Sequence, residues 1–141
     1  MKRYFSSIFA IALLCTSFNV LAQNPARTPV YKLSDTLRGT LTPERTWWDV
    51  QRYDVTVKAD FATKSTSGSN KITYKVVKAN NGSTKMQIDL KAPLKIERVV
   101  YNGSKNLKFE AKNGVWYVTV PSQKEGVENT VQVYFDGKPQ E

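Results

Sequence analysis

The side chains that most often carry enzyme chemistry are largely missing from this chain. Its 141 residues include no histidine and a single cysteine, Cys15. Without imidazole, a Ser-His-Asp triad, a Cys-His pair and a histidine zinc site are excluded. No aspartate-rich calcium loop and no glycine-rich phosphate loop occurs either. We therefore expect no metal, no other cofactor and no catalytic residue in this chain.

Two pairs of acidic residues remain as candidates for acid–base chemistry. Asp49 with Asp54, and Asp89 with Glu97, could in principle flank a glycosidic bond. Their spacing is not distinctive, so they are interpreted as surface or strand-end acids. A small carboxylate enzyme stays an alternative, which glycosidase activity abolished by changing Asp49 or Asp89 would support.

Aromatic side chains are the other candidates for a site. Trp47 and Trp48 are adjacent, so in an extended chain they point to opposite sides. One can then enter the core while the other contacts a ligand or a neighbouring domain. Trp116 alternates with Val118 and Val120, which predicts a core position. Trp47 and Trp48 are therefore the candidate ligand or interdomain contacts.

Residues 1–22 have the pattern of a secretory signal peptide. Lys2 and Arg3 supply the positive start, residues 8–15 form an unbroken apolar run, and Ala22 is a small residue at the cleavage position. The run is shorter than the roughly 20 residues that span a bilayer. The pattern predicts export to the periplasm or the cell surface, with no membrane span after cleavage.

The chain is basic, with a net charge of +9. A basic excess can indicate nucleic acid or another anionic partner. Here the lysines are scattered between apolar strand positions, as on a solvated face. We expect no nucleic-acid partner.

The segment 23–46 reads as an extended linker or arm. It contains Pro25, Pro29 and Pro43 among many polar residues, without apolar periodicity.

From residue 47 onward apolar and polar residues alternate, which is typical of half-buried strands. No stretch shows helical periodicity. The pattern predicts an all-β domain at 47–141, an antiparallel β-sandwich or saddle-shaped sheet of about seven strands, expected to be incomplete at its C-terminal end. The expected inward positions are Tyr53, Val55, Val57, Ala59 and Phe61; Ile72, Tyr74 and Val76; Met86, Ile88 and Leu90; Leu107 and Phe109; and Val131, Val133 and Phe135. Turns are expected at 64–70, 80–83, 102–103, 113–114 and 136–137.

Several short runs, taken in order, resemble one enzyme family. They are Thr42-Pro43-Glu44-Arg45 followed by Trp47-Trp48-Asp49-Val50, then Ile72-Thr73-Tyr74, Met86-Gln87-Ile88-Asp89-Leu90 and Gly137-Lys138-Pro139. Residues 37–141 are similar to the N-terminal β domain of exported aminopeptidase N-type zinc metallopeptidases, the gluzincin aminopeptidases, especially those of Bacteroidetes-like bacteria.

This resemblance implies a larger enzyme that removes N-terminal residues from peptides. In the family a thermolysin-like domain follows the β domain, and its H-E-x-x-H motif and a downstream glutamate bind zinc. A metal-bound water then attacks the first peptide bond. None of these residues maps onto this chain, so the chain alone is expected to be inactive. The β domain is expected to cap the active-site cleft and to expose an apolar patch where the catalytic domain docks.

A binding module is the alternative to an enzyme domain. An exported β-sandwich with a solvent-facing Trp47 or Trp48 could bind carbohydrate or a cell-surface polymer by aromatic stacking.

Overall fold

The computed structural model describes residues 31–80 and 85–139. The predicted signal peptide, Cys15, the first part of the predicted linker and most of the turn at 80–83 lie outside these residues. No helix in the described part of the chain is long and apolar enough to cross a membrane.

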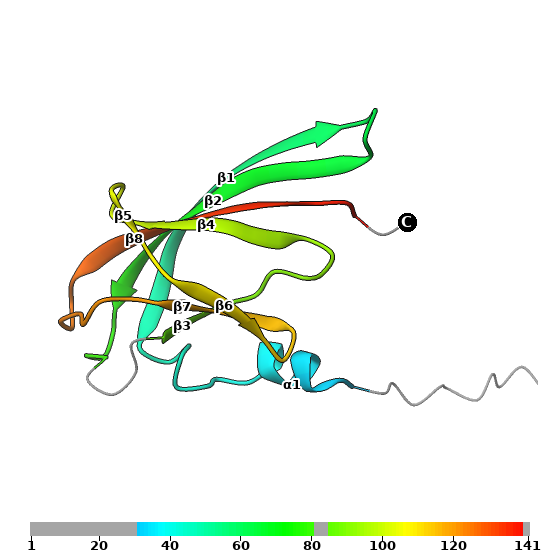
Figure 1. Ribbon diagram of the computed structural model, residues 1–141. Coiled ribbons are helices and arrows are strands. Elements are labelled where there is room, and N and C mark those ends of the chain that lie inside the picture. The colour runs from blue at the N-terminus through cyan, green and yellow to red at the C-terminus, as the bar shows by residue number, and fades with distance from the viewer. Residues whose placement is uncertain (1–30, 81–84, 140–141) are drawn as a thin grey trace, which may run out of the picture. The chain divides into compact units, whose positions relative to one another are not determined.

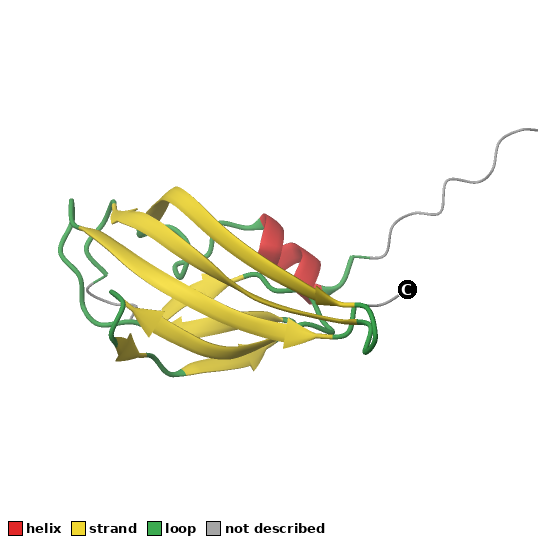
Figure 2. Ribbon diagram, turned by 90° about the horizontal axis from the view of Figure 1, so that it is seen from above, coloured by secondary structure: helices red, strands yellow, loops and turns green. Residues whose placement is uncertain are grey.

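The described residues form one short helix and eight strands, shown in Figures 1 and 2. The all-β prediction is therefore confirmed. The elements are α1 (Leu33–Gly39), β1 (Trp48–Asp60), β2 (Ser65–Val76), β3 (Lys85–Ile88), β4 (Lys95–Tyr101), β5 (Lys105–Asn106), β6 (Phe109–Lys112), β7 (Val115–Thr119) and β8 (Glu128–Gly137).

Two antiparallel sheets build the domain. The larger has the strand order β1-β2-β8-β4-β5 and the smaller has the order β3-β7-β6. Strand β8, near the end of the chain, lies between β2 and β4, so the large sheet is completed only by a long-range pairing. Figure 1 shows the small sheet beneath part of the large one, while β1 and β2 continue beyond it.

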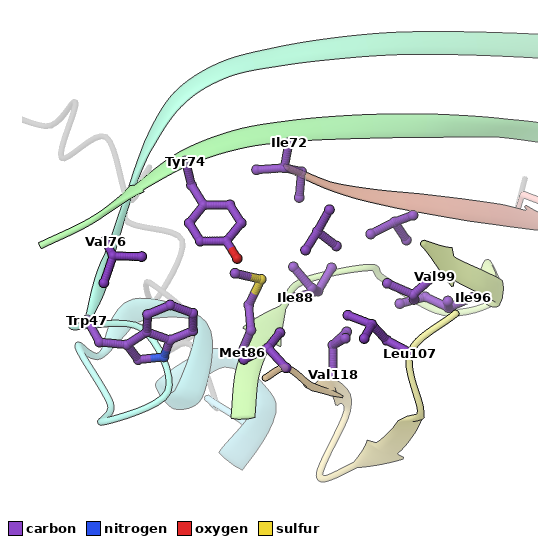
Figure 3. Packing of buried hydrophobic residues seen from close by; sticks show 13 residues of the cluster. Trp47, Ile72, Tyr74, Val76, Met86, Ile88, Ile96, Val99, Leu107 and Val118 are labelled. Atoms are coloured by element: carbon purple, nitrogen blue, oxygen red, sulfur yellow. The ribbon is translucent and has the colours of Figure 1, made fainter. Parts of the chain in front are cut away.

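The core lies between the two sheets. Alternate residues of β2 and β8 supply its upper face, and β3 and β7 supply its lower face (Figure 3). Burial of such side chains stabilises a domain by roughly 25 cal/mol per Å² of apolar area. The buried cluster consists of Trp47, Ile72, Tyr74, Val76, Met86, Ile88, Ile96, Val99, Leu107, Val118, Val120, Val131 and Val133.

Two Asn-Gly pairs make the tight turns that the sequence predicts. Asn102 and Gly103 have φ of 45° and 75°, and Asn113 and Gly114 have 55° and 77°. Positive φ at both central positions matches the twist of the adjoining strands, and Asn and Gly tolerate it best.

The expectation of an extended segment up to residue 46 is wrong for part of it, because residues 33–39 form α1. The Asp35 carboxylate accepts a hydrogen bond from the Lys32 backbone N–H at 3.0 Å, which caps the first turn. The helix has no buried residue. Leu33 and Leu37 lie one turn apart, but a helix of seven residues is too short for this spacing to form a recognisable periodic pattern.

Two predicted turns are strand instead. Residues 65–70 belong to β2, and Asp136 and Gly137 belong to the end of β8. Ser67 pairs with Asp136, and Thr66 pairs with Gly137. Pairing with neighbours on both sides holds this Ser/Thr/Gly stretch extended, against its local preference for a turn.

The strand expected around Leu107 and Phe109 is divided. Leu107 is buried between β5 and β6, and Phe109 begins β6 in the other sheet. In β7, Val115 and Val118 are fully buried while Trp116 is only partly buried against the core. The chain passes from the large sheet to the small sheet between β5 and β6, so no single strand contains both Leu107 and Phe109.

Candidate functional site

The inner face of the large sheet continues past the small sheet. Tyr53 pairs with the core residue Ile72, and Val55 and Val57 are the next two residues on the same face. Their side chains are 54%, 58% and 60% exposed. The prediction that these residues are half-buried is wrong, because the small sheet ends before it reaches them. We call Tyr53, Val55, Val57, Gly68, Asn70 and Phe135 the overhang.

Gly68 and Phe135 lie next to each other in the middle of the overhang. They are cross-strand partners on β2 and β8. A Cβ on Gly68 would lie 2.9 Å from Phe135 Cζ and 2.2 Å from the Thr56 backbone oxygen. The Phe135 ring therefore lies over Gly68, where any side chain would collide with it.

An open pocket of about 380 Å³ lies at the base of the overhang. Its lining combines aromatic, aliphatic and polar groups, which is typical of binding sites that fix a ligand's orientation with a few polar contacts. The lining residues are Arg45, Trp48, Tyr53, Val55, Asn70, Ile72, Gln87, Ile88 and Asp89.

The polar groups of this pocket are unequally satisfied. Arg45 Nη1 lies 2.8 Å from Asp89 Oδ2, and Gln87 Nε2 donates to Asp89 Oδ1 at 3.0 Å. Asn70 Oδ1 is buried and accepts no hydrogen bond from the described residues. A buried acceptor without a donor costs about 1–3 kcal/mol. The pocket thus offers one open acceptor to a ligand or a neighbouring domain.

Arg45 also ties α1 to the pocket. Its Nη1 donates to the Arg38 carbonyl at 2.9 Å, and Gln87 Nε2 reaches the Leu37 carbonyl at 3.2 Å. Arg38 in turn donates to the Gly114 carbonyl at 2.8 Å. The carbonyls at the end of α1 are therefore satisfied by side chains.

Trp47 and Trp48 lie on the same side of the chain rather than on opposite sides. Trp47 is 3% exposed and donates from Nε1 to the Lys85 carbonyl at 3.1 Å. Trp48 is partly buried, and both rings contact Tyr74, with centroids 5.9 and 5.7 Å away. Trp47 precedes β1, so strand alternation does not separate the two rings. Of the two candidates, Trp48 lines the pocket.

Two of the four acidic candidates are paired with arginine side chains. Asp54 lies 2.9 Å from Arg52, and Asp89 is held by Arg45 in the pocket. Glu97 is exposed on β4. No group of three or more His, Cys, Asp or Glu side chains that could hold a metal ion occurs among residues 31–80 and 85–139.

A buried polar network was missed by the sequence patterns. The Tyr74 hydroxyl donates to Gln123 Oε1 at 2.9 Å, and Asn129 Nδ2 donates to the same oxygen at 2.8 Å. Tyr101 donates to Asn129 Oδ1 at 2.9 Å. Burial raises the pKa of Tyr74. The network joins β2, β4 and β8 to the segment before β8. In the sequence, the only sign of this network is that polar residues occur within otherwise apolar stretches.

No protein-family model matches the chain, and no curated protein matches it in sequence. Solved structures do match in fold. The M1 zinc metallopeptidase from Deinococcus radiodurans shares 18% identity with a TM-score of 0.56, over 68% of this chain and 21% of that one. Leukotriene A4 hydrolase from Saccharomyces cerevisiae shares 23% identity with a TM-score of 0.55, over 79% of this chain and 17% of that one.

At these identities the likeness is one of fold. The chain spans about a fifth of the length of these enzymes. Another matching structure is that of a two-domain M1 zinc metallopeptidase, of which this chain spans 21%. The class defined here is therefore a two-sheet antiparallel β domain like one found in M1 zinc metallopeptidases.

Proposed function

We propose that this chain is the leading, non-catalytic β domain of an exported zinc aminopeptidase. The observation that carries the proposal is the likeness in fold to the M1 zinc metallopeptidases. The ordered motifs of residues 37–141 support the same assignment independently. In this role the domain caps the active-site cleft, and the zinc, its ligands and the peptide-bond chemistry belong to the rest of the enzyme.

The overhang supports a docked neighbour. Its valines alternate as a buried face does, yet they are more than half exposed. Contiguous exposed apolar surface marks an interaction site. The open acceptor of Asn70 at its base suits a donor from the neighbour. Because the chain resembles the aminopeptidase family, we propose that this neighbour is the catalytic domain.

The first test is the genomic sequence beyond the codon for Glu141. We expect the reading frame to continue into an H-E-x-x-H motif with a glutamate further along. A stop codon with no such sequence downstream would contradict the proposal for this gene product.

A second test uses that longer enzyme. Val57→Lys places a charge in the overhang and should lower both aminoacyl-p-nitroanilide hydrolysis and thermal stability, because the domains no longer pack. Ser67→Lys is the matched control, since Ser67 is exposed and lies on the opposite face of the same hairpin. Equal effects of the two variants would argue against docking through the overhang.

A stand-alone binding module is the second candidate, favoured by the pocket at Trp48 and Tyr53. Aromatic rings beside polar groups suit a sugar. Titration of the purified protein with oligosaccharides, followed by tryptophan fluorescence, tests it. A saturable shift lost in Trp48→Ala would favour this function, whereas no shift with any glycan would remove its support.

A further inference from the structure

β1 is an edge strand of the large sheet. Among the described strands it pairs with β2 on one side only. After the register shift between Val50 and Arg52, residues 52–60 run without Gly or Pro, and every one of them is exposed. A long, exposed edge presents unpaired backbone groups to any second strand.

The charges along this edge complement themselves about a single point. If two copies of β1 run antiparallel with Thr56 opposite Thr56, then Asp54 faces Lys58 and Arg52 faces Asp60. Each pair occurs twice by symmetry. Within one strand Arg52 already contacts Asp54 at 2.9 Å. Each charged residue therefore faces an opposite charge across the two strands, and Arg52 and Asp54 are also opposite charges along one strand. Opposite charges on directly facing residues stabilise a strand pair.

Neighbouring registers lose this match. If the twofold axis passes through Val55 instead of Thr56, Arg52 lies opposite Lys58. If the axis passes through Val57, Asp54 lies opposite Asp60. Like charges directly opposite destabilise a strand pair. The charge pattern therefore selects one register among these three.

The same register suits the inner face. It places Val55 opposite Val57, which are both β-branched, and the aromatic ring of Tyr53 opposite the small side chain of Ala59. The two overhangs then form one apolar surface.

We propose that β1 pairs with β1 of a second copy of this chain, antiparallel and about a twofold axis through Thr56. The large sheets of the two copies become continuous. An isologous contact of this kind needs one self-complementary surface. The pairing uses the backbone edge of β1, whereas the docking proposed above uses the side chains of the overhang.

Sedimentation equilibrium of the purified protein tests the proposal. We expect a monomer–dimer equilibrium that Lys58→Asp weakens at least about tenfold, because two carboxylates then face each other on both sides of the axis. Asp54→Lys alone should also weaken it, and the double variant D54K/K58D should restore it. Lys105→Asp is the matched control, since it makes the same charge change on β5 at the other edge of the sheet.

Disulfide trapping tests the register. In a Cys15→Ser background, Thr56→Cys should cross-link two copies, because directly opposed antiparallel residues lie within disulfide reach. Ser67→Cys, one strand away from the edge, should not. A monomer at all concentrations, an equal effect of K105D and K58D, failure of the double variant to restore the dimer, or equal cross-linking at both cysteines would each overturn the proposal. Circular dichroism confirms that each variant is folded.

Discussion

Single side chains at the core and pocket show how burial decides a residue's role. Tyr74 is fully buried and has its hydroxyl satisfied by Gln123, so it is a structural residue. Tyr53 lies on the same face of the sheet but beyond the core, so its ring is available to a partner. Both residues are tyrosines, and their different burial gives them different roles.

Tyr74→Phe should lower the free energy of unfolding by about 1–2 kcal/mol, because a buried hydrogen bond is lost. Urea denaturation measures the change. Tyr31→Phe is the control, since Tyr31 is 73% exposed, and it should have no effect. Equal stability of the wild type and Y74F would contradict the assigned network.

The stability of the protein should fall in alkaline solution. Burial raises the pKa of Tyr74 above its usual value of 10.0, so the folded protein holds this proton more tightly than the unfolded chain does. The stabilisation is present below the unfolded pKa and is lost as the pH rises above it. Urea midpoints measured from about pH 9 to about pH 11 should decline, and less steeply for Y74F. Identical slopes would contradict this.

At the scale of elements, packing across strands and helix caps holds the overhang and the pocket in place. β1 and β2 continue beyond the small sheet, and β8 supports them with Phe135 over Gly68. On the other side of the pocket, Arg45 joins α1 to Asp89. Neither contact involves neighbours in the sequence.

Gly68→Ala should destabilise the domain by about 1–3 kcal/mol, because its Cβ would overlap the Thr56 carbonyl and the Phe135 ring. Thermal unfolding measures this. Gly39→Ala is the matched control, since nothing lies within 4 Å of a Cβ there, and it should change stability by less than about 0.5 kcal/mol. Similar values for the two variants would show that the strands separate freely at Gly68.

Arg45→Ala should release α1 from the pocket. The helix has no buried residue, so its contacts through Arg45, Gln87 and Arg38 hold it. Amide hydrogen exchange of residues 33–39 should become at least about tenfold faster. Arg52→Ala removes an exposed ion pair on β1 and should leave that exchange unchanged. An equal rise in both variants would contradict the role given to Arg45.

At the scale of the whole molecule, the domain has its own core and an apolar face that this core leaves uncovered. The first property allows the chain to fold, and the second is the observation on which the proposed docking of a neighbouring domain rests. The edge of β1 carries the backbone groups for strand pairing, and the side chains of Tyr53, Val55 and Val57 on the same strand form part of the overhang.

Chelation should not affect the fold of this chain. It has no histidine and only one cysteine, so nothing in it resembles a structural zinc site. The thermal midpoint in EDTA should equal that in buffer. A fall in the thermal midpoint that added zinc reverses would contradict this.

Much of the fold could be predicted from local patterns. Alternation in β2 correctly identifies Ile72, Tyr74 and Val76 as core residues, because side chains alternate between the faces of any strand. The turns at Asn102-Gly103 and Asn113-Gly114 follow from the preference of these residues for positive φ. Both signals act over a few residues, so they can be read along the chain.

The candidate site was only half predictable. The sequence by itself determined the all-β class, the two aromatic candidates and the absence of imidazole chemistry, since composition and period-two alternation carry that information. Only the tertiary structure decided that Trp47 is buried while Trp48 lines a pocket, and that Val55 is exposed while Ile72 is covered. Alternation states which residues share a face. Whether a second layer covers that face depends on where β3 and β7 end, and that is set by contacts between residues far apart in the chain.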